Sequence, residues 1–407
     1  MPTRRRLRLL VALAAVWALP PASETAAPAL SPPRCFGRSP TIVGTAGGDR
    51  LVGTVRKDVI VGLRGNDVIL GLGGDDRVCG GRGHDRLYGG RGGDLISGDS
   101  GNDSLFGEHG NDRLLGREGT DGCVQGGGHG IRDTCPVVVA AAGDIACEPG
   151  EDRTSGSCRM KDTSDLLVGQ GLVAVLPLGD NQYEDGALEK YRKVYDETWG
   201  RVLDMTHPVP GNHEYGTEDA DGYFDYFRSA AGSRGRGYYS FDLDGWHLIA
   251  LNSTCGAVGG CDPGSPQHDW LKADLAASNA ACTLAYWHQP RFASGHYGND
   301  SQYQPFWELL FDDGAEIVLN GHDHNYQRYA PMTPNGMRND GKGIREFIVG
   351  TGGKAHYAVD SSGTNREAAN GSTYGVLRLT LAEGSYSWQF VPETRGGYTD
   401  SGSASCH

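Results

Sequence analysis

The chain has 407 residues, 64 of them glycine, and its 51 acidic and 37 basic residues give a formal net charge of −14. This charge argues against nucleic acid or an anionic membrane as a partner. No run of about 18 apolar residues occurs, so we expect no transmembrane segment. The length favours about two or three domains.

The N-terminus has the pattern of an export signal. Four arginines within residues 4–8 precede the apolar run Leu9–Leu19, and Ala27-Pro28-Ala29 offers a cleavage site between small residues. We therefore expect a signal peptide over roughly residues 1–29 and a secreted, extracellular protein. The arginines also resemble a twin-arginine signal, but other export signals carry several arginines, so the export route stays open.

Ten cysteines in an exported chain predict disulfide bonds. Three pairs are close enough in sequence to close short loops: Cys147/Cys158, Cys255/Cys261 and Cys123/Cys135. Many other connectivities are possible, so the pairing stays open. A zinc site is the competing interpretation, and the absence of any Cys-x-x-Cys pair argues against it.

A nine-residue unit repeats nine times from Gly44 to Val124. Its first position is always glycine, its sixth is always aspartate, and its eighth is apolar in every unit except the last, which has Cys123. Glycine permits tight turns with positive φ. One carboxylate per turn supplies the hard oxygen that Ca²⁺ prefers. The apolar column can face inward and stack on its neighbours.

The repeats resemble the RTX, or haemolysin-type, calcium-binding repeats. The resemblance implies an all-β parallel β-roll over residues 36–135, with the repeats at 44–124. It also implies Ca²⁺ beside the aspartates of most units. These are Asp49, Asp67, Asp76, Asp85, Asp94, Asp103, Asp112 and Asp121. The second unit carries Arg56 and Lys57 before its aspartate, so we expect no ion there.

From Val137 onward, short buried strands alternate with helices, and most of the acidity lies in this part. This pattern predicts an α/β domain over residues 136–407, long enough for a full core. The expected strands are Val137–Ala142, Val173–Leu178, His247–Leu251, Cys282–Trp287, Glu316–Leu319 and Glu346–Val349. The expected helices are Gly186–Trp199, Pro266–Ser278 and Gln302–Phe311. Tyr374–Val391 reads as a hairpin that turns at Glu383-Gly384.

Polar residues follow several of these strands, at the sheet edge where α/β proteins place their sites. In chain order they are Asp144, Asp180, Tyr183, Asn212-His213, His288 and His322-Asp323-His324. Carboxylate, amide oxygen and imidazole together suit a pair of first-row metal ions. Two such ions can clamp the attacking and leaving oxygens of a displacement at phosphorus.

The order Asp, Asp, Asn-His, His and His-x-His resembles the calcineurin-like metallophosphoesterases. Most of that superfamily begins with Asp-x-His, whereas this chain has Asp144-Ile145-Ala146. A replacement donor, Tyr183, stands three residues after Asp180. Loss of the histidine with gain of the tyrosine resembles the purple acid phosphatases. The resemblance implies an α/β metallophosphoesterase β-sandwich flanked by helices.

The resemblance also implies a role for each residue at a matching position. An Fe³⁺ ion and a divalent ion (Zn, Fe or Mn) would share Asp180. The Fe³⁺ would take Asp144, Tyr183 and His324, and the divalent ion Asn212, His288 and His322. His296 would be the general acid that protonates the leaving alkoxide. His213 would touch phosphate or orient a ligand.

The sequence therefore predicts a secreted phosphatase that hydrolyses phosphate monoesters by metal-hydroxide attack. Its partners would be a phosphate ester and calcium, with no nucleic acid. A phosphodiesterase or nucleotidase on the same metal pair is an alternative, because the same ligands serve both chemistries. A second alternative is a non-catalytic, calcium-dependent surface binding protein.

Overall fold

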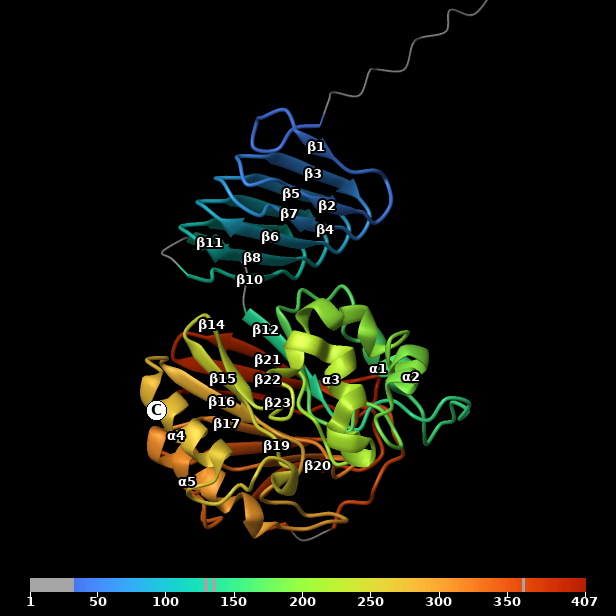
Figure 1. The fold of residues 1–407 in the computed structure, drawn as a ribbon, viewed down its shortest axis with the longest axis vertical. Coiled ribbons are helices and arrows are strands. Elements are labelled where there is room, and N and C mark those ends of the chain that lie inside the picture. The colour runs from blue at the N-terminus through green and yellow to red at the C-terminus, as the bar shows by residue number, and fades with distance from the viewer. Residues whose placement is uncertain (1–32, 128–130, 134–136, 361–362) are drawn as a thin grey trace, which may run out of the picture.

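The structure, a computed structural model, describes residues 33–127, 131–133, 137–360 and 363–407. The expected signal peptide, Cys135 and the expected domain boundary at residue 136 all lie outside these ranges. The described chain forms a β-roll above a larger α/β domain (Figure 1). The expected fold class is confirmed.

The roll consists of two parallel sheets, because successive units of nine residues alternate between them. One sheet contains β1 (Ile42–Val43), β3 (Val59–Arg64), β5 (Arg77–Arg82), β7 (Leu95–Ser100), β9 (Arg113–Glu118) and β11 (Ile131–Asp133). The other contains β2 (Arg50–Val52), β4 (Val68–Leu70), β6 (Arg86–Arg91), β8 (Ser104–His109) and β10 (Gly122–Val124). Each strand therefore pairs with a strand eighteen residues away, as Leu87 pairs with Leu105.

The core of the roll is the apolar eighth position of the repeat. The fully buried members are Ile60, Ile69, Val78, Leu87, Ile96, Leu105, Leu114 and Cys123. The first turns also carry a small cluster around the disulfide Cys35–Cys79, which the sequence analysis did not anticipate.

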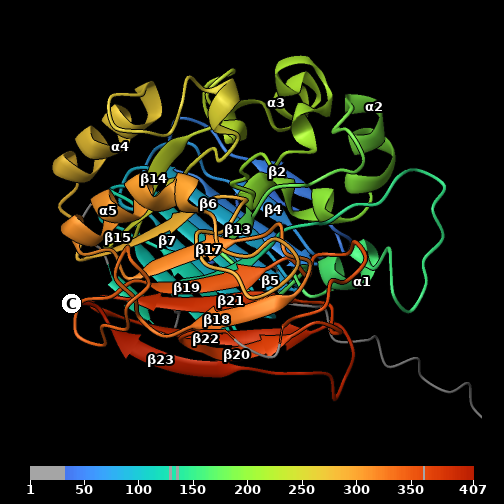
Figure 2. The same cartoon turned by 90° about the horizontal axis from the view of Figure 1, so that it is seen from below.

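The larger domain is a sandwich of two sheets. The first has the strand order β13 (Ala174–Pro177), β12 (Val137–Ala142), β21 (Gly375–Ala382), β22 (Ser385–Pro392), β23 (Ser401–Ser405). The second has the order β14 (Tyr239–Leu243), β15 (Trp246–Ala250), β16 (Cys282–Tyr286), β17 (Ile317–Asn320), β19 (Arg345–Val349), β18 (Tyr326–Tyr329), β20 (Arg366–Asn370). In Figure 2, helices α2, α3 and α4 lie along one side of the strands, opposite β20 and β23.

Alternating side chains of the second sheet enter two cores. Leu248, Leu284 and Leu319 pack against the first sheet. Their neighbours Ile249 and Val318 pack in a second cluster. That cluster includes apolar residues of α4 (Pro266–Ala277) and α5 (Gln304–Asp313). The period of two in side-chain direction thus builds the layered α/β fold.

Most expected elements are present, within two residues at their ends. The hairpin is confirmed, with Gly384 at φ +73° in its turn. The expected helix over 186–199 is wrong in type, because α2 (Leu188–Lys190) continues as a π-helical segment at Tyr191–Tyr195. The short helices α1 (Met160–Asp165) and α3 (Asp221–Phe227) were not anticipated.

Two of the three candidate disulfides, Cys147–Cys158 and Cys255–Cys261, are confirmed. A further bond, Cys282–Cys406, ties the chain's last residues to β16. Among the described residues, no helix is long and apolar enough to cross a membrane.

Glu346 on β19 gives the fold a testable pH dependence. Its buried Oε1 accepts hydrogen bonds from the backbone N–H groups of Arg291 and Phe292, and burial raises its pKa to about 8. The pKa of Glu346 is therefore higher in the folded protein than in the unfolded chain. Its contribution to the free energy of unfolding is complete below pH 4.5 and is lost as the pH rises through about 8. Glu346→Gln should flatten this dependence in urea titrations from pH 5 to 9. Glu383→Gln, exposed in the hairpin turn, is the control. If the free energy of unfolding depends on pH equally in the wild type and in Glu346→Gln, Glu346 is not the source of this dependence.

Candidate metal centre

The polar residues expected at the strand ends do converge on one edge of the sandwich. Asp144 follows β12, Asp180 follows β13, His288 follows β16, and His322 and His324 follow β17. Asp144, Asp180 and His322 have positive φ values of 61°, 46° and 68°. Non-glycine residues rarely adopt this conformation, and such strain clusters at functional sites.

Tyr183 lies at the centre of the first group of side chains. Its buried hydroxyl lies within hydrogen-bonding distance of two carboxylate oxygens, Asp144 Oδ1 at 2.9 Å and Asp180 Oδ2 at 3.0 Å. The same hydroxyl lies 3.0 Å from His324 Nε2. Burial and the two carboxylates raise the pKa of Tyr183 well above its usual range. A cation at this point would reverse that effect and favour the phenolate.

Asp180 also contacts a second group. Its Oδ2 lies 3.1 Å from His288 Nε2, and His288 Nε2 lies 3.2 Å from His322 Nδ1. Burial opposes protonation of His288, but the charge of Asp180 outweighs it and raises the pKa to about 9. Burial and the neighbouring His288 lower the pKa of His322 to about 3. One ligand atom from each of the three residues lies within 4.8 Å of the others.

Backbone carbonyls hold the Nδ1 atoms of His288 and His324. His288 Nδ1 donates to Leu178 O at 2.8 Å, and His324 Nδ1 donates to Ala355 O at 2.6 Å. These bonds direct Nε2 of each ring toward the carboxylates. Such outer contacts orient the histidine ligands of metal sites.

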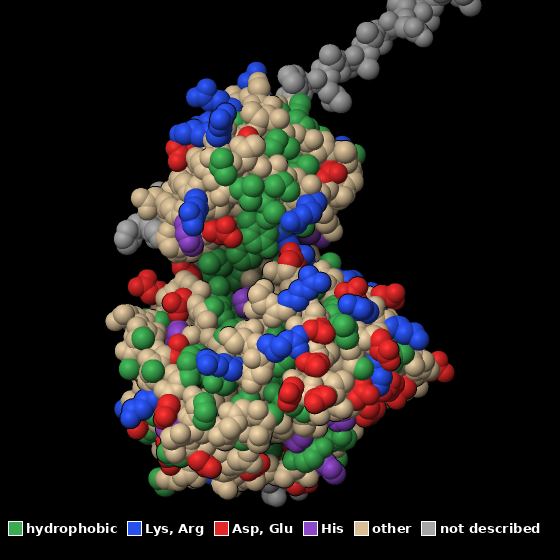
Figure 3. All heavy atoms as spheres, viewed as in Figure 1, with side chains coloured by type: hydrophobic (Ala, Val, Ile, Leu, Met, Phe, Trp, Pro, Cys, Tyr) green, Lys and Arg blue, Asp and Glu red, His purple; other side chains and the backbone are tan. Residues whose placement is uncertain are grey.

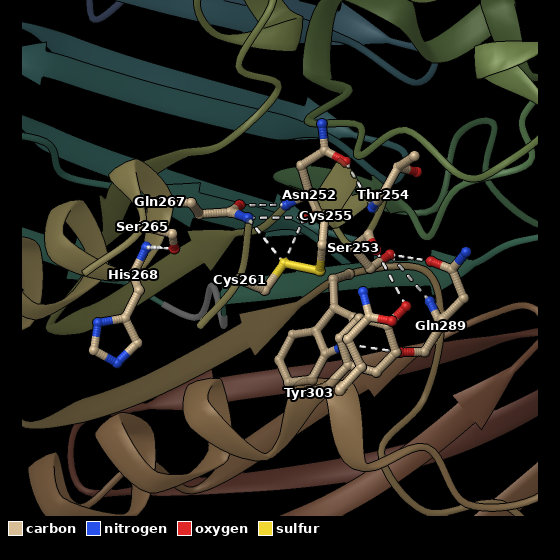
Figure 4. The surroundings of a disulfide bond; sticks show 12 residues. Asn252, Ser253, Thr254, Cys255, Cys261, Ser265, Gln267, His268, Gln289 and Tyr303 are labelled. Atoms are coloured by element: carbon tan, nitrogen blue, oxygen red, sulfur yellow. Dashed lines mark hydrogen bonds between the residues drawn. A yellow bond between two sulfur atoms is a disulfide. The ribbon is translucent and has the colours of Figure 1, made fainter. Parts of the chain in front are cut away.

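Asn212 lies at the exposed edge of this cluster, where its Oδ1 accepts a hydrogen bond from Gln289 at 3.4 Å. Figure 4 shows what holds Gln289: its side chain meets Ser253, in the loop closed by the disulfide Cys255–Cys261. A loop after β15 thus supports the expected amide ligand.

Glu214 connects two of the ligand-bearing loops. This buried side chain accepts hydrogen bonds from the backbone N–H groups of Asn181 at 2.9 Å and Gly211 at 2.7 Å. It also accepts one from the Tyr191 hydroxyl at 2.9 Å. Glu214 therefore fixes the loop of Asp180 relative to the loop of Asn212.

The expected auxiliary histidines lie at the rim. The ring of His213 packs on Tyr183 at 4.3 Å, and its Nε2 is 3.8 Å from Asp180 Oδ2. His296 is exposed, and its backbone N–H donates to Asp323 Oδ1 at 3.1 Å. Asp323 thus holds the His296 backbone.

Three rim residues escaped the sequence analysis. The Tyr297 ring stacks on His322 at 3.9 Å, and the Tyr357 ring stacks on His324 at 4.0 Å. Lys354 places its ammonium 4.7 Å from the Tyr183 ring and pairs with Glu184 at 2.6 Å. Residues outside the metal-ligand pattern have no spacing signal that would reveal them.

The aspartates of the roll form a second set of buried carboxylates. From Asp67 to Asp121, each Oδ1 accepts the backbone N–H of the aspartate eighteen residues earlier, as Asp103 does from Asp85 at 2.8 Å. Five Oδ2 atoms are buried without a hydrogen-bond partner in the described chain. They belong to Asp67, Asp76, Asp85, Asp94 and Asp103. Burial raises the pKa of Asp85 to about 7 and that of Asp103 to about 8.

Other aspartates of the repeat have a donor for Oδ2. The Oδ2 atoms of Asp49 and Asp58 accept hydrogen bonds from Thr45 and Thr54, respectively. Asp112 Oδ2 accepts one from Gln125 Nε2 at 3.1 Å, so the unpartnered acids belong to the third to seventh units. Orphaned carboxylate oxygens fit a hard cation such as Ca²⁺.

Comparison with known proteins identifies both parts. Residues 139–326 match the family of calcineurin-like phosphoesterases, and residues 52–87 and 88–122 each match the RTX calcium-binding nonapeptide repeat. The chain therefore carries a calcineurin-like phosphoesterase domain behind RTX repeats. Within that class, its relatives are purple acid phosphatases.

Purple acid phosphatase 15 of Arabidopsis thaliana is 34% identical over 159 residues, which is 34% of this chain and 29% of that protein. Purple acid phosphatase 21 of the same plant is 28% identical over 239 residues, covering 54% and 50%. A purple acid phosphatase from yellow lupin has the same fold, with a TM-score of 0.54 and 18% identity over 66% of this chain and 53% of its own. The chain spans no more than half the length of these two curated relatives.

Proposed function

We propose that the protein is a secreted binuclear-metal phosphatase that hydrolyses phosphate monoesters. The observation that carries this proposal is the position of Asp180. Its buried carboxylate lies 3.0 Å from the Tyr183 hydroxyl and 3.1 Å from His288 Nε2, so it belongs to both ligand groups. A carboxylate so placed can bridge two cations. Secretion is supported by the disulfides and by the export-signal pattern of the sequence.

The donor sets fit two different ions. Asp144, Tyr183 and His324, with the shared Asp180, offer the hard anionic oxygens that Fe³⁺ prefers. His288, His322 and the amide of Asn212 suit a divalent Zn, Fe or Mn ion. When bound, the two ions supply an activated water and neutralise charge that develops on the phosphoryl oxygens.

The chain's own residues supply the remaining chemistry. His296 lies at the exposed rim, where an alkoxide would leave, and can deliver its proton. His213, whose ring packs on Tyr183, is placed to donate a hydrogen bond to a bound phosphate. Glu214 keeps the loops of Asp180 and Asn212 in register. In the roll, the orphaned Oδ2 atoms would hold Ca²⁺.

Removal of a ligand should abolish turnover without unfolding the domain. We expect His322→Ala and Asn212→Ala each to lower kcat for an aryl phosphate by on the order of a hundredfold or more. His109→Ala, exposed on the roll, is the matched control. Near-UV circular dichroism checks folding. Full activity in the ligand variants would refute the binuclear mechanism, and a clear preference for the matching diester would refute the monoesterase assignment.

Tyr183 should give the purified protein a visible colour, because a tyrosinate bound to Fe³⁺ absorbs by charge transfer. Tyr183→Phe should lose this band. Tyr357→Phe, which alters the ring stacked on His324, should keep it. The measurement is a visible spectrum combined with metal analysis. A colourless, active wild type that contains only zinc or manganese would rule out the iron assignment.

Calcium removal should unfold the roll, whose apolar core is a single column of residues. Since Asp85 and Asp103 have raised pKa values of about 7 and 8, Ca²⁺ must displace protons. Its affinity, measured by calorimetry, should therefore fall as pH drops from 8 to 6. Asp103→Asn should weaken binding, whereas Asp58→Asn, whose carboxylate is already bonded by Thr54, should not. Proteolysis of the roll that is insensitive to chelator would contradict this account.

A further inference from the structure

Strand β13 (Ala174–Pro177) is the element through which the roll can influence the metal centre. It is last in the strand order of its sheet, beside β12, and on its other side isolated parallel bridges join Val175 to Thr206 and Leu178 to Val209. Asp180 follows its carboxyl end within three residues. Contacts that hold the N-terminal end of β13 therefore influence the position of Asp180.

The segment that leads into β13, residues 167–172, is docked on the roll. Ser104 Oγ donates to Leu172 O at 2.6 Å, and Asn102 Nδ2 donates to Gly169 O at 3.0 Å. The approach is so close at Gly171 that a Cβ there would lie 2.2 Å from Thr120 O. We call residues 167–172 the docking loop.

An ion pair and a shared core reinforce this junction. Arg86 Nη1 lies 2.7 Å from Asp204 Oδ1, and the Arg86 side chain is only 19% exposed. Val124 of the roll belongs to the same buried cluster as Leu172 and Val173. Figure 3 shows hydrophobic side chains gathered down one face of the roll to this junction.

The turns of the roll next to the docking loop form one row along one edge of the roll. Every second aspartate of the repeat lies in this row. In this row His84 N donates to Asn66 Oδ1, Asn102 N to His84 Nδ1, and Thr120 N to Asn102 Oδ1, each at 2.9 Å. The next residue in each turn is one of the buried aspartates. These are Asp67, Asp85, Asp103 and Asp121. Asp67 and Asp85 also line a cavity of about 160 Å³ between the row and the docking loop.

We propose that calcium in this row of turns controls the stability of the phosphatase domain by holding the docking loop and, through it, β13. The proposal rests on the proposed calcium binding and goes beyond it. Without the ion, the buried Oδ2 atoms of Asp67, Asp85 and Asp103 have no partner in the described chain, and the turns loosen. Asn102 and Ser104 then lose their fixed positions, and β13 loses the support of the docking loop.

Tryptophan fluorescence of the protein without its expected signal peptide separates the two parts. Of the seven tryptophans, six lie from Trp199 to Trp388, Trp17 lies in the expected signal peptide, and the repeats at 44–124 contain none. The fluorescence melting curve therefore reports the phosphatase domain alone. We expect saturating Ca²⁺ to raise that melting temperature by about 5 °C, at constant occupancy of the metal centre.

Charge-reversal variants of the Arg86–Asp204 ion pair test whether calcium acts on the phosphatase domain through this junction. Arg86→Glu and Asp204→Arg should each reduce the calcium-induced shift by about half or more. The double variant should restore it. Arg113→Glu is the control, because Arg113 occupies the same place in its unit but is exposed on the opposite sheet. Ser104→Ala should also lower the shift.

Calorimetric titration with Ca²⁺ accompanies every variant. The proposal is supported if calcium binds the wild type and raises its melting temperature fully, and if it binds the junction variants but raises their melting temperature less. Calcium binding without any shift in wild type, or an unchanged shift in Arg86→Glu and Ser104→Ala, overturns it. Absence of calcium binding refutes the proposed calcium sites, and the coupling falls with them, while the phosphatase assignment is tested separately by the ligand variants.

Discussion

The buried carboxylate of Asp180 organises the phosphoesterase domain. Its two oxygens contact Tyr183, His288 and the backbone N–H of His213, which come from three separate loops. A buried anion in such a position must be compensated, either by protonated neighbours or by cations. The glycines beside it follow from this crowding, since a Cβ at Gly211 would lie 2.2 Å from Asp180 Oδ1.

The roll applies the same constraint in a repeated form. Each turn buries an aspartate whose second oxygen, from Asp67 to Asp103, lacks a hydrogen-bond partner in the described chain. In both parts, then, the polypeptide buries carboxylates in positions that a cation can complete. Because the roll touches the loop that precedes β13, the two sets of carboxylates are connected through a short stretch of backbone.

Much of this organisation was predictable from sequence, because it depends on local periods. A nine-residue period places each glycine, aspartate and apolar side chain in a fixed column. The buried core strands β12 and β16 are visible in the sequence as largely apolar runs. The candidate ligands Asp144, Asp180 and His288 could be found because each follows such a run. Strands β18, β20 and β23 could not, since their residues are polar or small and their pairing depends on distant partners. The disulfide Cys282–Cys406 and the role of Glu214 depend in the same way on contacts between remote segments.

The most direct test of the central claim is anomalous X-ray diffraction from crystals of the iron-loaded protein, collected on both sides of the iron absorption edge. We expect an iron peak bounded by Asp144, Asp180, Tyr183 and His324. A second metal peak should lie about 3.5–4 Å away, next to His288 and His322. A single ion, or iron bound away from Tyr183, would contradict the account.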